Sequence, residues 1–429
     1  MRQTVKSIMP VLFLPAAFIS LRLVLATEPS WTGPPHGARP AVSAGRSESG
    51  TPDVVSGSIV GWGQQVVLPP WELSNLTAVA GGGYHSLGLK ADGSIVAWGD
   101  NYAGECNVPA PNTGFVAVAG GGGHSLGLKA DGSIVAWGLN NWGQCNVPAP
   151  NTGFVAVAGG LYHSLGVKAD GSIVAWGYNA AGQCNVPGPN TGFVAAAGGW
   201  VHSLGLKADG AIVAWGDSYY GQGNVPAPNT GFVGVAAGAN HSLGLKTDGS
   251  IVAWGNNLYG QRNVPPPNTG FVAVAAGDRH SLGLKADGSI VAWGSNYYGQ
   301  GNVPAPNTGF VAVAGGYLHS LGLKADGSIV AWGRNDAGQC NVPAPNTDFV
   351  AATGGGSHSL GLRVLVPGDF DGDGDVDLSD FTTFQLCFGG SNNPPAPTCP
   401  PGVDADLDGD GDVDLVDFLV FQQNFTGAL

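Results

Sequence analysis

Aspartates near the C-terminus recur at a spacing that suits a hard metal ion. Asp369, Asp371, Asp373, Asp375, Asp377 and Asp380 stand at positions 1, 3, 5, 7, 9 and 12 of a loop with glycine at position 6. The pattern returns 37 residues later in Asp406, Asp408, Asp410, Asp412, Asp414 and Asp417. Carboxylates at these positions, with a backbone carbonyl from position 7, are the ligands that Ca²⁺ prefers. The sequence therefore predicts two calcium ions, one in each loop.

An acidic run that is merely solvated would not place glycine and valine at the same offsets twice, as Gly374-Val376 and Gly411-Val413 do. Without a cation the carboxylates that converge in each loop would repel one another. We therefore expect folding of this region to be linked to metal binding.

Each acidic loop leads into an apolar segment with helical periodicity, residues 378–388 and 415–425. A loop followed by a helix, repeated once, resembles the EF-hand-like type I dockerin, and the resemblance covers residues 367–429. It implies a cohesin partner, often recognised through a hydroxyl pair just before the last calcium ligand. Leu378-Ser379 and Leu415-Val416 stand there instead. This departure affects cohesin recognition and leaves calcium binding unaffected.

Histidines recur with a constant period in the rest of the chain. Each is followed by serine, at a spacing of 39 residues: His85, His124, His163, His202, His241, His280, His319 and His358. A catalytic site needs different groups brought together, whereas these histidines share one local setting. We expect them to be structural, bonded to neighbouring backbone. No G-x-S-x-G motif and no phosphate-binding loop accompanies them.

One repeat predicts three strands, residues 115–119, 124–129 and 133–138, with an Asp131-Gly132 hairpin between the last two. The first and third strands are apolar on both faces, so both faces should be covered. Small sheets stacked face to face around an axis form a β-propeller. The fold class is therefore all-β.

The ends of the repeat array complement each other. Residues 56–63 supply a third strand alone, and residues 349–362 supply a first and second strand alone. Pairing them would close the ring and remove exposed sheet edges. Seven complete units plus this split unit favour eight blades over residues 54–366, and seven blades stay possible.

The repeated motif, as in Gly121–Gln144, has the form G-x-x-H-S-L-x-L-K-x-D-G-x-I-V-A-W-G-x-N-x-x-G-Q. It resembles the repeat family of the regulator of chromosome condensation and the β-lactamase inhibitor protein II. The resemblance covers residues 54–366 and implies a propeller of seven blades. The count of eight departs from it.

Comparison of the repeats with one another separates constant from variable positions. Two windows vary: the two residues before each His-Ser and the four residues after each Trp-Gly. All ten tyrosines and two tryptophans fall in these windows: Tyr84, Tyr102, Trp142, Tyr162, Tyr178, Trp200, Tyr219, Tyr220, Tyr259, Tyr297, Tyr298 and Tyr317. Strand polarity places both windows on one face of the disc. Because tyrosine and tryptophan are enriched at recognition surfaces, these residues are predicted to bind a protein or glycan. The alternative is that they pack gaps between blades.

Charge is low and uneven. Charged residues make up 11% of the chain, and 13 aspartates with no lysine or arginine lie between Val364 and Leu429. Binding nucleic acid requires cationic neutralisation of phosphates, and no basic stripe supplies it. Nucleic acid is therefore excluded as a partner.

The N-terminus predicts export from a bacterial cell. Arg2 and Lys6 precede an apolar run, and Ala26 offers a cleavage site for a signal peptide of residues 1–26. The alternative is a membrane anchor, but Arg22 leaves too short an uncharged stretch. Residues 27–53 are predicted to be a disordered linker, and the mature protein is expected at the cell surface or outside the cell.

The cysteines fall into two groups. Cys106, Cys145, Cys184 and Cys340 share one repeat position, and equivalent positions on adjacent blades lie too far apart for a disulfide. Cys387 and Cys399 are the better candidates for one, close in sequence in an exported chain.

The leading function is a secreted, non-enzymatic binding protein with a calcium-loaded tail for docking or surface display. A second possibility is a polysaccharide-active hydrolase, for which Asp100, Glu105, Asp217, Asp278 and Asp336 are the available carboxylates. A third possibility is one of the roles known for the family that the repeat resembles, nucleotide exchange or enzyme inhibition. Export contradicts nucleotide exchange on a nuclear GTPase, and resemblance alone does not establish inhibition of an extracellular enzyme.

Overall fold

The computed structural model describes residues 57–64, 75–364, 368–370, 376–391, 393–400, 403, 405–407 and 411–425. The signal segment, the linker and five loop aspartates lie outside the described residues; these aspartates are Asp371, Asp373, Asp375, Asp408 and Asp410.

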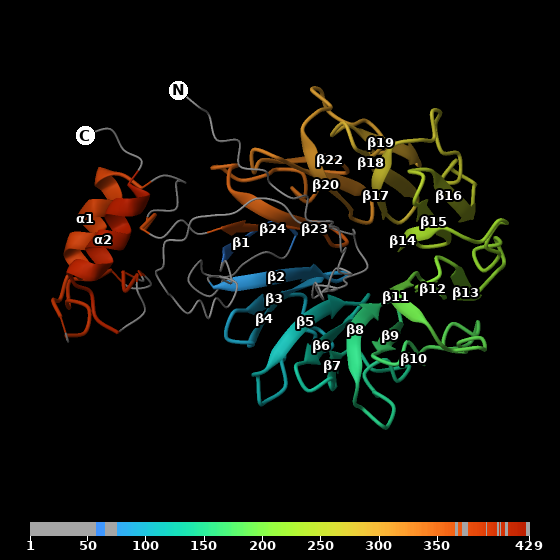
Figure 1. Cartoon of the computed structure of the whole chain (residues 1–429), viewed down its shortest axis with the longest axis horizontal. Helices are drawn as coiled ribbons and strands as arrows, with labels where there is room; N and C mark the ends of the chain where they lie inside the picture. The colour runs from blue at the N-terminus through green and yellow to red at the C-terminus, as the bar shows by residue number, and fades with distance from the viewer. Residues whose placement is uncertain are drawn as a thin grey trace, which may run out of the picture.

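Each blade contains three antiparallel strands, and the blades follow one another around a ring in chain order (Figure 1). Six blades are separate sheets, and the other two are joined into one sheet by a single residue pair, Gly57 opposite Leu76. The inner strands are β2 (Leu76–Gly81), β5 (Phe115–Gly120), β8 (Phe154–Gly159), β11 (Phe193–Gly198), β14 (Phe232–Ala237), β17 (Phe271–Ala276), β20 (Phe310–Gly315) and β23 (Phe349–Gly354). The middle strands are β3 (His85–Lys90), β6 (His124–Lys129), β9 (His163–Lys168), β12 (His202–Lys207), β15 (His241–Lys246), β18 (His280–Lys285), β21 (His319–Lys324) and β24 (His358–Val364). The outer strands are β1 (Gly57–Gly63), β4 (Ile95–Gly99), β7 (Ile134–Gly138), β10 (Ile173–Gly177), β13 (Ile212–Gly216), β16 (Ile251–Gly255), β19 (Ile290–Gly294) and β22 (Ile329–Gly333).

The first and last strands of the array close the ring. β1 pairs with β24 in one continuous antiparallel register, from Gly57 opposite Val364 to Gly63 opposite His358. The eighth blade is therefore β23-β24-β1, assembled from both ends of the array. This confirms the prediction of eight blades, and the ring differs in blade number from the seven that the resemblance implied.

The hairpin between middle and outer strands is a three-residue loop. In the blade of β5–β7 the N–H of Lys129 donates to the carbonyl of Ser133 at 2.8 Å, which leaves Ala130, Asp131 and Gly132 in the turn. Gly132 has φ +77°, a conformation that glycine adopts without strain. Asp131 Oδ1 accepts from both the N–H and the hydroxyl of Ser133. The sequence predicted the hairpin, although the loop is one residue longer than the Asp-Gly pair.

The core is divided into eight apolar clusters, each between two neighbouring blades. In one of them Leu126 and Ile134 of one blade pack against Phe154 and Trp176 of the next. The outer strand of each blade has apolar residues on both faces, and a single sheet cannot bury both. Packing against the two neighbouring blades covers them.

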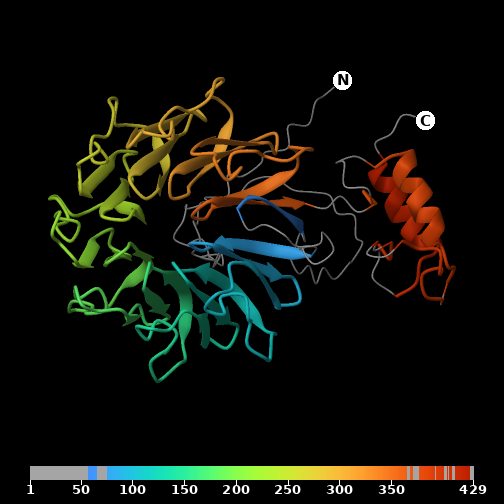
Figure 2. The ribbon, with the colours of Figure 1, turned by 180° about the vertical axis from the view of Figure 1, so that it is seen from behind.

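The C-terminal region contains helices α1 (Leu378–Cys387) and α2 (Leu415–Asn424), which lie outside the ring in both views (Figures 1 and 2). Phe384 and Phe421 are buried between them, with ring centroids 5.5 Å apart. Cys387 and Cys399 form a disulfide, as the sequence favoured. Both helices match the apolar segments predicted after the acidic loops.

Candidate functional site

The repeated histidines form a closed ring of side-chain hydrogen bonds between blades. Nε2 of each histidine lies 2.9–3.1 Å from the serine Oγ of the next blade, 40 residues further along the chain, and His358 reaches Ser86 to complete the circle. The histidines are structural, as expected. The expectation of bonds to neighbouring backbone is incomplete: the hydroxyl of the adjacent blade is the partner of Nε2 in every case, and a backbone group of the next histidine also acts on four of the rings, those of His85, His241, His280 and His319.

The serines of this ring define which atom carries the histidine proton. Ser203 Oγ donates its hydrogen to the carbonyl of Gln183 at 2.9 Å, so it must accept from His163 Nε2. Six other serines of the ring donate to a carbonyl in the same way. The histidines that face these seven serines are therefore neutral, with the proton on Nε2; they are His85, His124, His163, His202, His241, His280 and His319. Burial lowers the pKa of all eight histidines of the ring from 6.5 to about 3 or about 4. A charged imidazole would have lost its water without gaining a negative partner.

The two variable windows meet directly above this ring. In the blade of β5–β7 the N–H of Leu139, the first residue after Trp-Gly, donates to the carbonyl of Gly123, the residue before His124, at 2.8 Å. The same bond recurs in the other six complete units. Both windows of a blade therefore lie at the same end of its sheet, which follows from the antiparallel path of the strands. We call this end of the propeller the variable face.

Several of the predicted binding residues contact one another on the variable face. Trp142 packs edge-on against Tyr178 of the next blade at 4.9 Å between ring centroids, and Tyr162 packs against Tyr178 at 6.3 Å. Other edge-on pairs are Tyr219–Tyr220, Tyr297–Tyr298 and Tyr84–Tyr317. The guanidinium of Arg279 lies over the ring of Tyr259, and that of Arg334 lies over Tyr298.

Exposure separates these residues into two groups. Tyr102, Tyr219 and Tyr297 at the second windows are 97%, 83% and 86% exposed. Tyr178, Trp200 and Tyr317 are half-buried. The sequence placed all of them in one class, but only the exposed group presents most of its side-chain surface to solvent.

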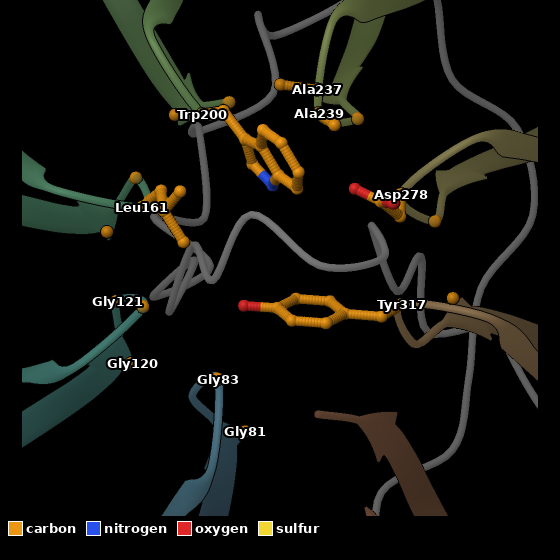
Figure 3. A pocket seen from close by; sticks show the side chains of 18 of the residues that line it. Gly81, Gly83, Gly120, Gly121, Leu161, Trp200, Ala237, Ala239, Asp278 and Tyr317 are labelled. Carbon is orange, nitrogen blue, oxygen red and sulfur yellow. The ribbon is translucent and has the colours of Figure 1, made fainter. Parts of the chain in front are cut away.

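The first residue of each first window lies at the axis of the propeller. Its N–H donates to a carbonyl of the next blade, and these bonds run around the axis through Gly83, Gly122, Leu161, Trp200, Ala239, Asp278, Tyr317 and Gly356. We call these eight residues the axial ring. Seven of them, all but Gly356, line a pocket of about 640 Å³ together with glycines and alanines at the ends of the inner strands, and part of this volume is open to solvent. Trp200, Asp278 and Tyr317 point into it (Figure 3).

Sequence reasoning missed the axial ring as a site. It counted Trp200 and Tyr317 as loop aromatics, and it considered Asp278 only as a carboxylate for a hydrolase. The position within the window was the available signal, since the first residue of each pair faces the axis and the second does not.

Four of the five carboxylates that a hydrolase could use are engaged in their own loops. Asp100, Glu105 and Asp217 accept from backbone N–H groups within two residues, and Asp336 pairs with Arg334. Glu105 replaces the glutamine that performs the same task in other loops. None of these four is presented to a substrate as half of an acid and base pair.

The cysteines at the shared repeat position are unsuited to chemistry. Cys106, Cys145, Cys184 and Cys340 are free thiols. Burial raises their pKa, to about 11 for Cys106 and Cys145 and about 12 for Cys184 and Cys340. Since the thiolate is the reactive form, these side chains stay unreactive near neutral pH.

The acidic loops of the C-terminal region are described in part. Asp412, Asp414 and Asp417 are buried, and one carboxylate oxygen from each lies within 4.8 Å of the others. Asp414 and Asp377 are the N-cap residues of α2 and α1, each in a capping box with the aspartate three residues later. Asp406 Oδ2 accepts from the N–H of Gly411 at 2.8 Å, which closes the loop between positions 1 and 6. Asp369 is also within the described residues.

Eight closed three-stranded blades with variable loops at one end define a β-propeller of the kind that presents a recognition surface on a rigid disc. The family follows from the repeats. The Regulator of chromosome condensation (RCC1) repeat matches seven times, at residues 76–105, 115–144, 154–183, 193–222, 232–261, 271–300 and 310–339. The repeated part of the chain therefore belongs to the RCC1 repeat family.

Solved structures of similar fold support this assignment. Prp20p of Saccharomyces cerevisiae, a structure described with its binding properties to Gsp1p and histones, aligns with a TM-score of 0.52 at 19% identity. The alignment covers 73% of this chain and 93% of that one. Yeast RCC1 (Prp20) bound to Kap60 gives a TM-score of 0.50 at 19% identity, covering 76% and 97%. At this identity the likeness concerns the fold.

The ectodomain of the Arabidopsis thaliana receptor kinase ACR4 aligns at 27% identity with a TM-score of 0.48, covering 62% of this chain and 99% of that one. Comparison with curated proteins gives no match. Neither helix of the described residues has the length and apolar character needed to span a bilayer.

Proposed function

We propose that this chain is an exported, non-enzymatic binding protein whose variable face recognises a protein partner. The carrying observation is the contrast within the repeat: the strands are almost identical, whereas the aromatic residues differ from blade to blade and are exposed at one end. Tyr102, Tyr219 and Tyr297 offer large, rigid contact area to solvent.

The fold supports a protein as the ligand, since propellers of this fold bind proteins. Prp20p binds Gsp1p and histones, and Kap60 is bound to it in one complex. The disulfide between Cys387 and Cys399 supports an oxidising compartment for the mature chain, because such bonds persist mainly outside the cytosol.

The test replaces Tyr219, Tyr220, Tyr297 and Tyr298 with alanine in one variant and measures capture of proteins from culture supernatant. The matched control replaces Val233 and Val272 with serine. These valines are 42% and 39% exposed near the start of their inner strands, at the opposite end of the blades. We expect loss of capture in the tyrosine variant only, with unchanged thermal unfolding. Capture of a carbohydrate polymer in place of a protein, or loss of fold in the tyrosine variant, would contradict the proposal.

The C-terminal acidic loops are proposed to bind two Ca²⁺ ions and to dock the protein to a cohesin-like partner or display it at the surface. The residues fit this ion: Asp412, Asp414 and Asp417 bring three carboxylates together in a buried place, where they would repel one another without a cation. Asp369, Asp377, Asp380 and Asp406 would contribute to the two loops at the positions that the sequence assigns.

Isothermal titration calorimetry of the full chain with Ca²⁺ tests the metal sites. We expect two ions for the unaltered chain and one for each of the variants Asp380→Asn and Asp417→Asn, which affect separate loops. A chain that binds no Ca²⁺ after chelation and dialysis would refute the calcium sites and leave the propeller proposal standing.

A further inference from the structure

Asp278 has the features of a ligand-binding carboxylate. Its side chain is only 10% exposed, and Oδ1 has no hydrogen-bond partner among the described residues. Oδ2 lies 3.3 Å from Nε of Arg279, whose guanidinium is held on the rim by the ring and hydroxyl of Tyr259. Among the described residues that line the axial pocket, Asp278 carries the only charge. A buried carboxylate oxygen without a donor is costly, and a ligand with a positive charge would relieve that cost.

Two aromatic side chains share the pocket with this carboxylate. Trp200 enters from one side and Tyr317 reaches across from another, and Asp278 lies on a blade between theirs (Figure 3). The edge of Tyr84 packs against Tyr317 at 6.4 Å and fixes its orientation. The faces of tryptophan and tyrosine rings attract cations, most strongly where water is excluded.

Glycines provide the room for this arrangement. A Cβ atom on Gly83 would lie 3.0 Å from the Tyr317 hydroxyl, and one on Gly356 would lie 3.2 Å from its ring. On Gly83 it would also lie 2.3 Å from the carbonyl oxygen of Gly122. The axial ring therefore holds Trp200, Asp278 and Tyr317 on one side, with glycines and the apolar side chain of Leu161 opposite them.

We propose that the axial pocket binds a compact organic cation, an alkylated or primary ammonium group, between Trp200, Tyr317 and the free oxygen of Asp278. The group belongs either to a free small molecule or to a side chain of the partner that covers the variable face. This inference goes beyond the proposed function and does not depend on it, because the four tyrosines of the earlier test lie outside the pocket.

Burial raises the pKa of Asp278, and Arg279 opposes that shift. The groups that face this carboxylate are Arg279 on its own blade and Tyr317 on the next. Tyr317 stays neutral, since burial also raises its pKa. Cation binding should therefore weaken as the pH falls towards the raised pKa of Asp278, because the protonated carboxyl has no charge to offer.

The experiment follows the indole N–H resonance of Trp200, assigned as the signal that Trp200→Phe removes, during titration of the full chain. Choline and its neutral isostere 3,3-dimethylbutanol are the probes. We expect choline to shift this resonance in a saturable manner and the isostere to bind at least tenfold more weakly. Asp278→Asn should lower choline affinity at least tenfold. Asp217→Asn, a carboxylate of the same face that is engaged in its loop, should leave the affinity unchanged.

Equal binding of choline and the isostere, or full choline affinity in Asp278→Asn, would overturn the proposal. An acetylated peptide with a single lysine distinguishes the two sources of the cation. Peptide affinity more than tenfold above that of butylammonium assigns the site to a protein partner, and equal affinity assigns it to a free cation. Absence of any shift with all of these probes refutes the site, whatever the tyrosine variant does to partner capture.

Discussion

Two regions of the propeller lie next to each other along the chain: the ring of His–Ser hydrogen bonds and the variable windows. The His–Ser pair is the same in every repeat, whereas the residues of the windows differ from repeat to repeat. Every blade contains the same histidine and serine, and both are almost fully buried. The residues just before each histidine range from glycine to tryptophan and aspartate. The difference follows from geometry: closing a circle requires each blade to present the same donor and acceptor to the next, whereas a loop tip has no such neighbour to satisfy.

This contrast also explains why a uniform repeat can carry a specific function. Tryptophan Nε1 and serine Oγ both donate to the same backbone carbonyl of the preceding blade, as Trp215 and Ser203 do to Gln183. The blade interfaces are built from groups that recur in each unit. If the variable face is the recognition surface that we propose, side chains in the windows can vary while the hydrogen bonds of the conserved ring still join the blades.

Acidification should lower the free energy of unfolding more than any other change that we predict, because it acts on all the histidines of the His–Ser ring. The folded pKa of the eight histidines lies at about 3 or about 4, below the ordinary value of 6.5. Between these values the unfolded chain binds more protons than the folded chain, so stability is complete above pH 6.5 and falls as the pH decreases. Each histidine contributes about 1.4 kcal/mol per pH unit to this loss.

The free energy of unfolding, measured by urea titration at several pH values, checks this prediction. Its slope between pH 6 and 5 reports the number of protons taken up on unfolding. This number should be several and should approach one for each histidine of the ring. A slope below about two protons would show that the histidines are not held neutral in the folded state.

Removal of a conserved tryptophan should lower the free energy of unfolding by less than acidification does and by more than a substitution in the windows does. Trp215 is buried between blades and bonded to Gln183, so Trp215→Ala should lower the free energy of unfolding by about 3–5 kcal/mol. Trp142→Ala, at a side chain that is 54% exposed in a window, is the matched control. Trp142→Ala should lower the free energy of unfolding by about 1 kcal/mol. Similar losses for both variants would contradict the distinction between conserved blade interfaces and variable windows.

Much of this fold could be predicted because the signals are local or periodic. Short apolar runs, the Asp-Gly turn and a gapless period of 39 residues predict strands, hairpins and blades. The complementary ends of the array also predict the pairing of β1 with β24. Polarity then places both windows at the same end of each sheet.

Contacts between blades could not be predicted in the same way. The serine that accepts from each histidine lies 40 residues away, and nothing in the repeated sequence favours this serine over nearby backbone as the partner. Trp200 and Tyr317 differ from Tyr102 in the sequence only by standing first in the first window, and the sequence does not say that this position faces the axis. Their places depend on the radius of the ring, which arises only when all blades are assembled.

The most direct test of the account compares one substitution at two positions in the blade of β11–β13. Ser203 lies in the buried ring between His163 and Gln183, whereas Ser218 lies exposed in a window. Urea unfolding of Ser203→Ala should show a loss of about 1–3 kcal/mol, because His163 Nε2 loses its buried acceptor. Ser218→Ala should change stability by about 0.5 kcal/mol or less. Equal losses, or a larger loss at Ser218, would contradict the division between a conserved interface and a free recognition face.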